Sequence, residues 1–365
     1  MSESEHRFGF VMEQTLGHVT HYRNLRATVD SDPSIRATWF PVPFEPASRI
    51  EALPPLVGNW SARASWHAAR ALREDNASRH FDALFFHTQV STLLSAGLMR
   101  RVPSVISLDA TPMNYDAVGQ AYGHQRGGRR AEAAKRWMNV RPLRAAAAII
   151  TWCDWARQSL VSDYGVEDAR VHVIAPGVNL SLWPHSSPSS DGGPMRILFV
   201  GGDFERKGGE TLLQAFAALN TPCELHLVTK AAIEPRQNVF VYHDVAPNSD
   251  LLKQLFATAD VFALPTLADC FPVAIQEAMA AGLPVVSTDV GAVGEAVREG
   301  MTGLLAPPGD VTQLRLALES LAGDPRLRRA MGARGREVAE REYDSAVNAR
   351  RILSLMTGLA ARAAA

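Results

Sequence analysis

Short β-branched apolar runs alternate with alanine-rich helical segments along the whole chain. In the first half, the apolar runs predict strands at 7–13, 81–86, 103–108, 147–151 and 170–174. In the second half they predict strands at 195–200, 223–228, 238–242, 260–264 and 283–287, with helices at 209–219 and 250–259. Strand–helix alternation is typical of parallel sheets covered by helices on both faces. The pattern therefore predicts an α/β protein with two doubly wound, Rossmann-like domains facing across a cleft.

A segment rich in proline, serine and glycine interrupts this alternation at 184–194. Such a composition is typical of linkers, so we expect an N-terminal domain over 1–183 and a C-terminal domain over 195–344. Residues 345–362 read as a last helix with apolar positions at Val347, Ile352, Leu353, Leu355 and Met356. We expect this helix to pack back on the N-terminal domain.

Composition narrows the class of protein. The 365 residues carry 37 basic and 38 acidic side chains, a formal net charge of -1, which gives no argument for a nucleic-acid partner. Cys153, Cys223 and Cys270 are far apart and show no metal-ligand or disulfide spacing, which favours a reducing compartment. The N-terminus lacks an apolar signal region, and the apolar runs are shorter than a membrane span. We therefore expect a cytoplasmic protein.

Two carboxylates stand close together in the stretch LADCFPVAIQEAMAAGLPVVSTDVG, residues 267–291. Asp269 precedes a predicted helix that Pro272 suits in its first turn, where the missing N–H costs little. Glu277 lies within that helix and shares an apolar face with Val273. An isolated glutamate of this kind is usually a surface or salt-bridged residue, so the rest of the chain decides whether it has a function.

A glycine-rich segment, VGGDFERKGGETLL at 200–213, follows a predicted strand and opens a predicted helix. Arg206 and Lys207 at a helix N-terminus suit an anion, although a solvated basic turn fits this segment equally well. It is neither a P-loop nor the dinucleotide fingerprint. Strand-to-helix loops of one sheet share one edge, which brings these cations to Asp269 and Glu277. Cations suit a diphosphate and carboxylates suit hydroxyl groups, so the combination predicts a sugar nucleotide.

The sequence from Asp269 through Glu277-Ala-Met-Ala-Ala-Gly-Leu-Pro-Val-Val resembles the signature of retaining glycosyltransferase family 4 (group 1), whose members have the GT-B fold. GAVGEAVREGMTGLLAPPGD at 291–310 and Lys207-Gly208 continue the resemblance. In the first half, VMEQTLGHVTHYRNL at 11–25 resembles the family's first strand and glycine-rich loop more loosely, and APGVN at 175–179 resembles the segment entering the interdomain linker.

This resemblance implies a nucleoside-diphosphate-sugar donor as co-substrate, retention of anomeric configuration, and no metal ion or cofactor. It implies that Lys207 binds the donor diphosphate, that Glu277 holds the ribose and that Asp269 lies near the transferred sugar. The implied catalytic residues are Asp269, Lys207 and Asp109. The implied donor-binding residues are Gly17, Gly202, Arg206, Lys207, Phe271, Pro272, Val273 and Glu277.

Three positions depart from the family pattern. Asp269 replaces the more usual glutamate and is shorter by one methylene. Gly201-Gly202 replaces a frequent Gly-Arg pair, so we expect Arg206 to supply the guanidinium if the loop allows. Asp109 stands near a position that is histidine in many members.

The N-terminal half is expected to contact the acceptor. His18 and His87 follow predicted strand ends, where ligands of such sheets bind, although a surface histidine and a structural one explain them equally well. Tyr115, together with Asp109, Thr111 and Asp116, follows another strand end. The basic segment 124–144, which includes Trp137 and Met138, suits anionic lipid headgroups or an acidic acceptor, or is a solvated helix face.

We therefore expect a metal-independent retaining hexosyltransferase that acts on a hydroxyl acceptor, which could be a glycan, a lipid-linked compound or a small molecule. Peripheral contact with the inner face of a membrane through 124–144 stays open. Two alternatives also stay open. One is a GT-B-fold epimerase acting on a sugar nucleotide, and the other is a non-catalytic subunit that binds a sugar nucleotide.

Overall fold

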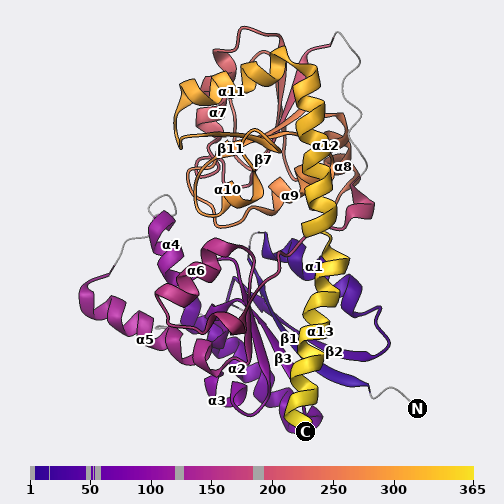
Figure 1. Cartoon of the computed structure of the whole chain (residues 1–365). Helices are drawn as coiled ribbons and strands as arrows, with labels where there is room; N and C mark the ends of the chain where they lie inside the picture. Colours follow the sequence, from indigo (N-terminus) through magenta and orange to yellow (C-terminus); the bar gives the residue numbers. More distant parts are fainter. Residues whose placement is uncertain are drawn as a thin grey trace. The chain divides into compact units, whose positions relative to one another are not determined.

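The computed structural model describes residues 5–15, 17–46, 51, 53, 59–119, 127–183 and 193–365. Nearly all of the expected linker at 184–194 lies outside the described residues, as does the start of the basic segment 124–144. The chain divides into two compact units (Figure 1). Unit 1 comprises residues 1–116, 125–176 and 345–365, and unit 2 comprises 117–124 and 177–344. The last segment of the chain thus belongs to unit 1.

Unit 1 is built on a parallel sheet of six strands in the order β2-β1-β3-β4-β5-β6. These strands are β1 (His6–Gln14), β2 (Ile35–Pro43), β3 (Ala83–His87), β4 (Ser104–Leu108), β5 (Ala148–Thr151) and β6 (Val171–Val173). Its helices are α1 (His18–Val29), α2 (Trp60–Arg79), α3 (Ala96–Met99), α4 (Pro112–Val118), α5 (Arg129–Ala145), α6 (Asp154–Ser162) and α13 (Ser345–Ala364), with short 3-10 turns η1 (Gln89–Thr92) and η3 (Asp168–Arg170). Helix α4 continues by two residues into the part of the chain assigned to unit 2.

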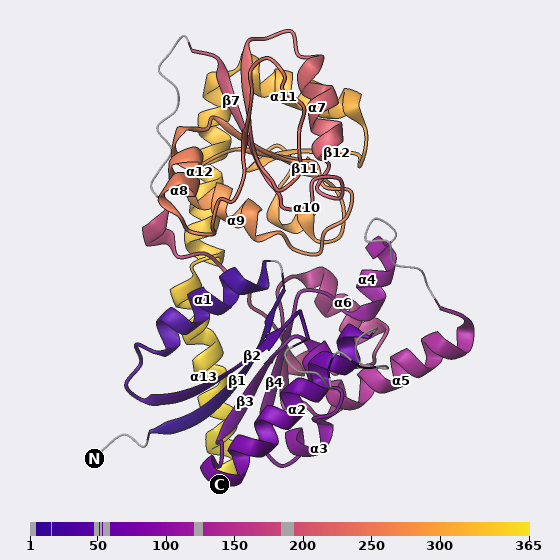
Figure 2. The same ribbon diagram turned by 180° about the vertical axis from the view of Figure 1, so that it is seen from behind.

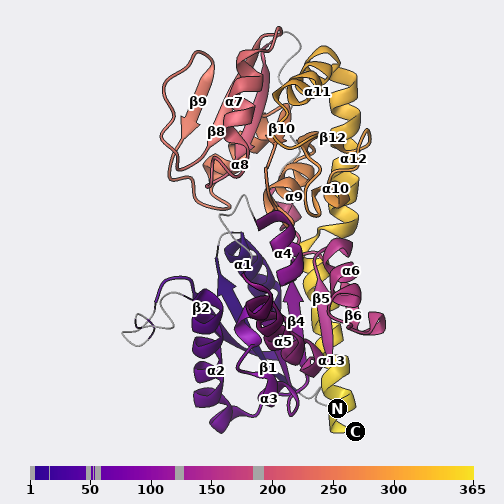
Figure 3. The same cartoon turned by 90° about the vertical axis from the view of Figure 1, so that its left-hand side faces the viewer.

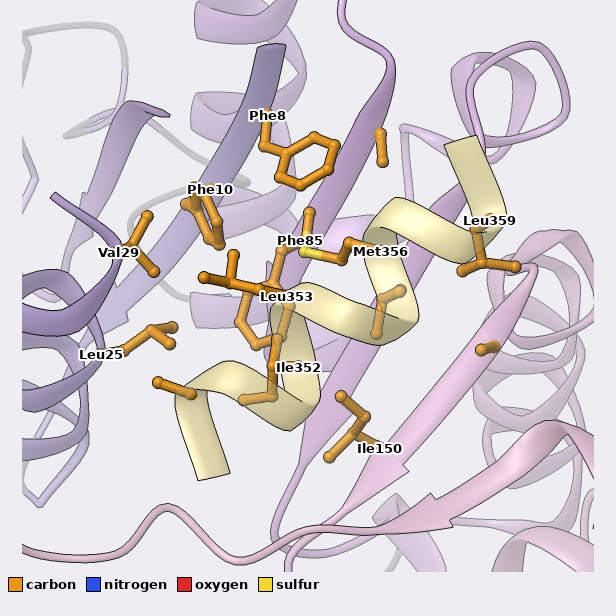
Figure 4. Packing of buried hydrophobic residues seen from close by; sticks show 14 of the residues in the cluster. Phe8, Phe10, Leu25, Val29, Phe85, Ile150, Ile352, Leu353, Met356 and Leu359 are labelled. Carbon is orange, nitrogen blue, oxygen red and sulfur yellow. The ribbon is translucent and has the colours of Figure 1, made fainter. Parts of the chain in front are cut away.

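Helix α13 completes the core of unit 1. It lies with α1 on one face of the sheet, while α2 covers the other face (Figures 1 and 2). Ile352, Leu353 and Met356 of α13 pack into a buried cluster with Phe10 of β1 and Phe85 of β3 (Figure 4). Each of these five side chains is at most 5 % exposed. Helix α13, at the far end of the sequence, therefore covers the apolar face of β1 and β3.

Unit 2 repeats this architecture with a parallel sheet in the order β12-β11-β10-β7-β8-β9 (Figure 3). The strands are β7 (Met195–Val200), β8 (Cys223–Val228), β9 (Val239–Tyr242), β10 (Val261–Leu264), β11 (Val285–Thr288) and β12 (Gly303–Ala306). The helices are α7 (Gly209–Ala217), α8 (Asp250–Thr258), α9 (Val273–Ala280), α10 (Val293–Ala296), α11 (Val311–Gly323) and α12 (Pro325–Glu342), preceded by the turn η4 (Leu180–Leu182). The prediction of two doubly wound α/β sheets is confirmed.

Helix α9 is buried along almost its whole length. The residues at its two ends explain where it begins and where it stops. Pro272 precedes the helix as its N-cap, one residue earlier than the first-turn position expected from the sequence. At the other end Gly282 has φ +77°, and its N–H donates to the Met279 carbonyl while Leu283 N–H donates to Ala278. This is a Schellman ending, which requires a left-handed residue and so favours glycine. The helix is thus held to eight residues between β10 and β11.

Each sheet reverses its strand order at one point. In unit 1 the reversal lies between β1 and β3, and in unit 2 it lies between β10 and β7. Ligands of open parallel sheets bind outside the carboxyl ends of strands at such a reversal. The loops that follow β1, β3, β7 and β10 are therefore the positions at which to look for functional side chains.

Candidate functional site

The reversal in unit 2 brings together the two segments that the sequence singled out. Lys207, in the loop after β7, forms an ion pair through Nζ with the Oδ2 atom of Asp269, in the loop after β10. The two residues are 62 positions apart, and both side chains are largely buried. A cation and a carboxylate therefore share one small site at the carboxyl end of the sheet.

Arg206 connects the same two loops from inside the protein. Its side chain is only 6 % exposed, and it donates to the Ala268 carbonyl at 2.9 Å and to Asp203 Oδ2 at 2.8 Å. The Arg206 carbonyl in turn accepts from Leu267 N–H at 2.8 Å. The guanidinium is directed at the protein's own groups, so Arg206 links the loop after β7 to the loop after β10 next to Asp269.

Two glycines allow this close approach of backbone segments. Gly208 has φ +76°, and a Cβ atom there would lie 1.8 Å from the Pro265 carbonyl oxygen. Gly291 has φ +56°, and a Cβ atom there would lie 2.0 Å from the Asp269 carbonyl oxygen. Neither position accepts a side chain without moving the backbone, so Gly208 allows the loop after β7 to pack on Pro265 and Gly291 allows close packing on the Asp269 backbone.

Glu277 is buried in α9 with 6 % of its surface exposed. Within the described part of the chain, its carboxylate has no hydrogen-bond or ion-pair partner. Burial raises the pKa of Glu277 to about 8, because desolvation disfavours the charged form. The salt-bridged and surface interpretations of this glutamate are therefore excluded for the described residues. A carboxyl group without an internal partner is free to bind a ligand.

The other predicted donor residues of unit 2 surround this site. Gly202 is exposed in the loop after β7, whereas Phe271, Pro272 and Val273 are buried at the start of α9. The Phe271 ring packs edge-on against Tyr343, with ring centroids 6.1 Å apart. These three residues fix the N-terminal turn of α9, where the first N–H groups have no partner within the helix.

The reversal in unit 1 holds a second buried ionic cluster. His18, at the start of α1, places Nδ1 3.4 Å from Oε1 of Glu13 and Nε2 3.8 Å from Oδ2 of Asp109. Thr15 and Thr88 both donate to the Glu13 carboxylate. Burial alone would lower the pKa of His18, but Glu13 and Asp109 outweigh it and raise the pKa to about 10. The imidazole is therefore positively charged at neutral pH.

Neutral aromatic rings surround that charge. The His87 ring stacks on Trp152 with an interplanar angle of 9°, and both His18 and His21 meet these rings edge-on. Burial, together with the charge of His18, lowers the pKa of His21 to about 3 and the pKa of His87 well below its ordinary value. The buried His87 ring thus packs against His18. Of the three histidines, only His18 is charged.

The remaining predicted residues of unit 1 have other surroundings. Thr111 bonds to Asn114 at 3.0 Å and to Ser159 at 2.7 Å, and Asp116 pairs with Lys135 at 2.8 Å. Gly17 is exposed directly before α1, and Tyr115 is half-buried in α4. Of the polar group expected after β4, Asp109 is the residue that lies beside His18. Glu13 was not predicted from the sequence, although its position at the end of β1 was a signal.

Among the described residues, no group of three or more histidine, cysteine, aspartate or glutamate side chains is arranged to hold a metal ion. Of the helices in the described part of the chain, none has both the length and the apolar character needed to cross a membrane.

Comparison with known proteins identifies both halves of the chain. Residues 194–324 match the family described as "Glycosyl transferases group 1", and residues 28–182 match "Glycosyltransferase Family 4". Glycogen synthase of Mycobacterium tuberculosis is 27 % identical over 237 residues, which is 60 % of this chain and 56 % of the relative. The chain thus spans about half the length of that curated relative.

Solved structures show the same architecture over almost the whole chain. Sucrose-phosphate synthase from Thermosynechococcus elongatus superposes with a TM-score of 0.76 and 19 % identity, covering 98 % of this chain and 100 % of the relative. The Anabaena HepE protein in complex with UDP and glucose superposes with a TM-score of 0.70 and 16 % identity, covering 97 % and 100 %. Because these two glycosyltransferase models together match most of the chain, the chain belongs to the group 1 glycosyltransferases of family 4.

Proposed function

We propose that the chain is a metal-independent retaining hexosyltransferase that moves a sugar from a nucleoside diphosphate to a hydroxyl acceptor. The Lys207–Asp269 pair beside the start of α9, with the partnerless carboxyl of Glu277 in the same helix, is the observation that carries this proposal. A diphosphate needs a cation, a ribose needs a hydrogen-bond acceptor, and this sheet edge supplies both.

In the proposed mechanism, the donor diphosphate replaces Asp269 as the partner of Lys207. Asp269 is then able to accept a hydrogen bond from a hydroxyl of the transferred sugar. Lys207 and the N-terminal turn of α9 stabilise the negative charge that develops on the leaving phosphate, and stabilisation of this kind often contributes most to an enzyme's rate enhancement. The leaving phosphate oxygen accepts the acceptor proton on the same face of the sugar, so no protein nucleophile is needed.

Glu277 is proposed to hold the ribose. Hydrogen bonds from two ribose hydroxyls favour the ionised carboxylate, which burial disfavours in the ligand-free protein. Ligand binding therefore releases a proton, and donor affinity rises with pH below about 8. UDP is the first ligand to test, because a protein of the same fold has been solved with UDP and glucose.

The acceptor is proposed to meet the His18 cluster of unit 1. His18 Nε2 and Asp109 Oδ2 are 3.8 Å apart, which leaves room for a hydroxyl that accepts from one and donates to the other. Glu13, Asp109 and charged His18 together carry one net negative charge. This charge favours a neutral hydroxyl compound over an acceptor phosphate at this position.

Helix α5 is proposed as a peripheral membrane contact. Trp137 is 61 % exposed on it, with Arg141 over the indole ring at 4.9 Å. Aromatic and cationic side chains on one helix suit an anionic bilayer surface. Sedimentation with phosphatidylglycerol vesicles, compared with phosphatidylcholine vesicles and with Trp137→Gln, tests this contact.

The deciding experiment is calorimetry with UDP on wild type, Lys207→Ala and the control Lys253→Ala, in which a lysine of α8 is removed. Losing a charge-assisted contact should weaken UDP binding of Lys207→Ala by about 1.5–3 kcal/mol, and Lys253→Ala should bind like wild type. Equal affinity for all three proteins would refute the diphosphate assignment. Product analysis with and without acceptor separates transfer from isomerisation of the donor.

A further inference from the structure

A cavity of about 540 Å³ lies in unit 1 far from the carboxyl ends of its strands. It is bounded by the residues that lead into β4, by the turn from α5 into β5, and by the last turn of α13. Strand β4 begins at Ser104 and β5 at Ala148, so the cavity faces the amino ends of these strands. It is therefore at the opposite edge of the sheet from the His18 cluster.

Four arginines line this cavity: Arg100, Arg101, Arg144 and Arg362. None of the lining residues that the structure describes is acidic. None of the four guanidinium groups makes an ion pair or hydrogen bond with another described residue. All four arginines are exposed, and like charges gathered around one cavity repel one another, so an anion among them lowers the energy of the arrangement.

Hydrogen bonds hold the backbone around Arg144 in place. Arg170 donates to the carbonyls of Leu143, at 3.1 Å, and of Ala146, which ties down the end of α5 beside Arg144. Ala147 N–H donates to the Ser104 carbonyl at 2.8 Å, which joins the turn to β4. Arg144 thus extends from backbone that is held by hydrogen bonds on both sides.

The positive charge continues past this cavity. Arg362 also lines a neighbouring cavity of about 560 Å³, together with Arg351 and His172. The apolar floor of the first cavity is formed by Met99 and Leu359, both nearly fully buried. The last turn of α13 therefore takes part in both cavities.

We propose that the arginine cavity binds an anion that carries two or more phosphate charges, such as a polyphosphate or a phosphate ester. Guanidinium groups match phosphate oxygens with paired hydrogen bonds, and the volume lies within the range of small-molecule sites. No nucleophile or general base lines the described cavity, so the site binds without chemistry. Because α3, α5 and α13 each contribute an arginine or its flanking residue, the anion holds the end of α13 against unit 1.

The test uses inorganic tripolyphosphate as the probe, with calorimetry at low ionic strength. The cavity variant is Arg101→Gln with Arg144→Gln. The matched control is Arg329→Gln with Arg334→Gln, two exposed arginines of α12 that do not line the cavity. Both variants are made in the Lys207→Ala background, which removes the competing diphosphate site. We expect tripolyphosphate to bind the control as it binds Lys207→Ala alone, and to bind the cavity variant at least tenfold more weakly.

Vesicles that contain phosphatidic acid, whose phosphomonoester headgroup carries up to two charges, are compared with phosphatidylcholine vesicles and separate a lipid headgroup from a free phosphate compound. Loss of vesicle binding in the cavity variant, with binding kept by the control and by Trp137→Gln, supports the site with a headgroup as its ligand. Equal binding by the cavity variant and the control, or no binding of either probe by Lys207→Ala alone, overturns the proposal. Arg144→Lys, which keeps the charge but loses the paired geometry, should bind tripolyphosphate with intermediate affinity.

Discussion

The buried carboxyl of Glu277 has no partner among the described residues, so we expect the stability of unit 2 to fall as pH rises. Burial raises its pKa from an ordinary 4.5 to about 8, so the folded protein keeps a proton that the unfolded chain has released. Stability of the ligand-free protein is therefore highest below the unfolded pKa and falls as pH rises through the folded pKa. Glu277→Gln has the shape of the protonated side chain and cannot ionise.

The size of the effect follows from the same shift. One pKa unit corresponds to ~1.4 kcal/mol, so the difference between the two pKa values lowers stability by roughly 5 kcal/mol above pH 8 and roughly 3 kcal/mol at pH 7. We expect Glu277→Gln to match wild type near pH 4.5 and to be more stable by several kcal/mol at pH 8. Donor affinity should change in the opposite sense and fall about tenfold, which is ~1.4 kcal/mol.

The assay is denaturant unfolding between pH 4.5 and 9, followed by hydrogen exchange of peptides from α9 so that unit 2 is reported separately. Glu234→Gln, at an exposed carboxylate in the same unit, is the control and should remain parallel to wild type. If the curves of Glu277→Gln and wild type stay parallel across this range, the carboxyl is not desolvated and the reasoning fails. Calorimetry with UDP in buffers of different ionisation enthalpy should also detect proton release by wild type and none by Glu277→Gln.

Other predictions concern metal dependence, packing and backbone strain. Transfer activity should persist in excess EDTA, and a loss that Mg²⁺ or Mn²⁺ restores would contradict the proposed mechanism. Met356→Ala, which empties a fully buried position of α13, should destabilise unit 1 by about 2–5 kcal/mol in denaturant unfolding and leave UDP affinity unchanged. Gly208→Ala should weaken UDP binding and lower the melting temperature, because the added methyl meets the Pro265 carbonyl; an unchanged protein would show that the loop is not close-packed.

Much of the fold could be predicted from the alternation of apolar runs, and the two strands that were not predicted, β2 and β12, each lie at a sheet edge. Strand β2 contains Pro41 and Pro43, which argue against a strand but are tolerated at an edge, where β2 lies. Strand β12 begins with a glycine, spans only Gly303–Ala306, and also lies at an edge. An edge position tolerates such residues, whereas the edge strands β6 and β9 keep β-branched apolar runs and were predicted.

The sequence could predict that Lys207 and Asp269 lie close together in unit 2 because each precedes a recognisable helix start. One helix follows a glycine-rich turn and the other follows a proline. The cluster in unit 1 was only half readable. Glu13 meets Thr88, which is 75 positions away, because the strand order reverses and makes β1 and β3 neighbours. No short pattern encodes that pairing. The structural role of Arg206, which donates to groups of two loops, could not be predicted either, because a buried arginine and a ligand-binding arginine look alike in sequence.

The placement of α13 bears on how the chain is made. Phe10 and Phe85 leave the ribosome early, yet the helix that covers them starts roughly 170 residues after Pro176, which at ordinary rates of synthesis is a delay of ~10–30 s. During that time unit 2 can finish folding while an apolar face of unit 1 is uncovered. Nascent chains should therefore bind chaperones through unit 1 until α13 has left the ribosome, and a stop codon near 345 should yield a folded unit 2 beside an aggregation-prone unit 1.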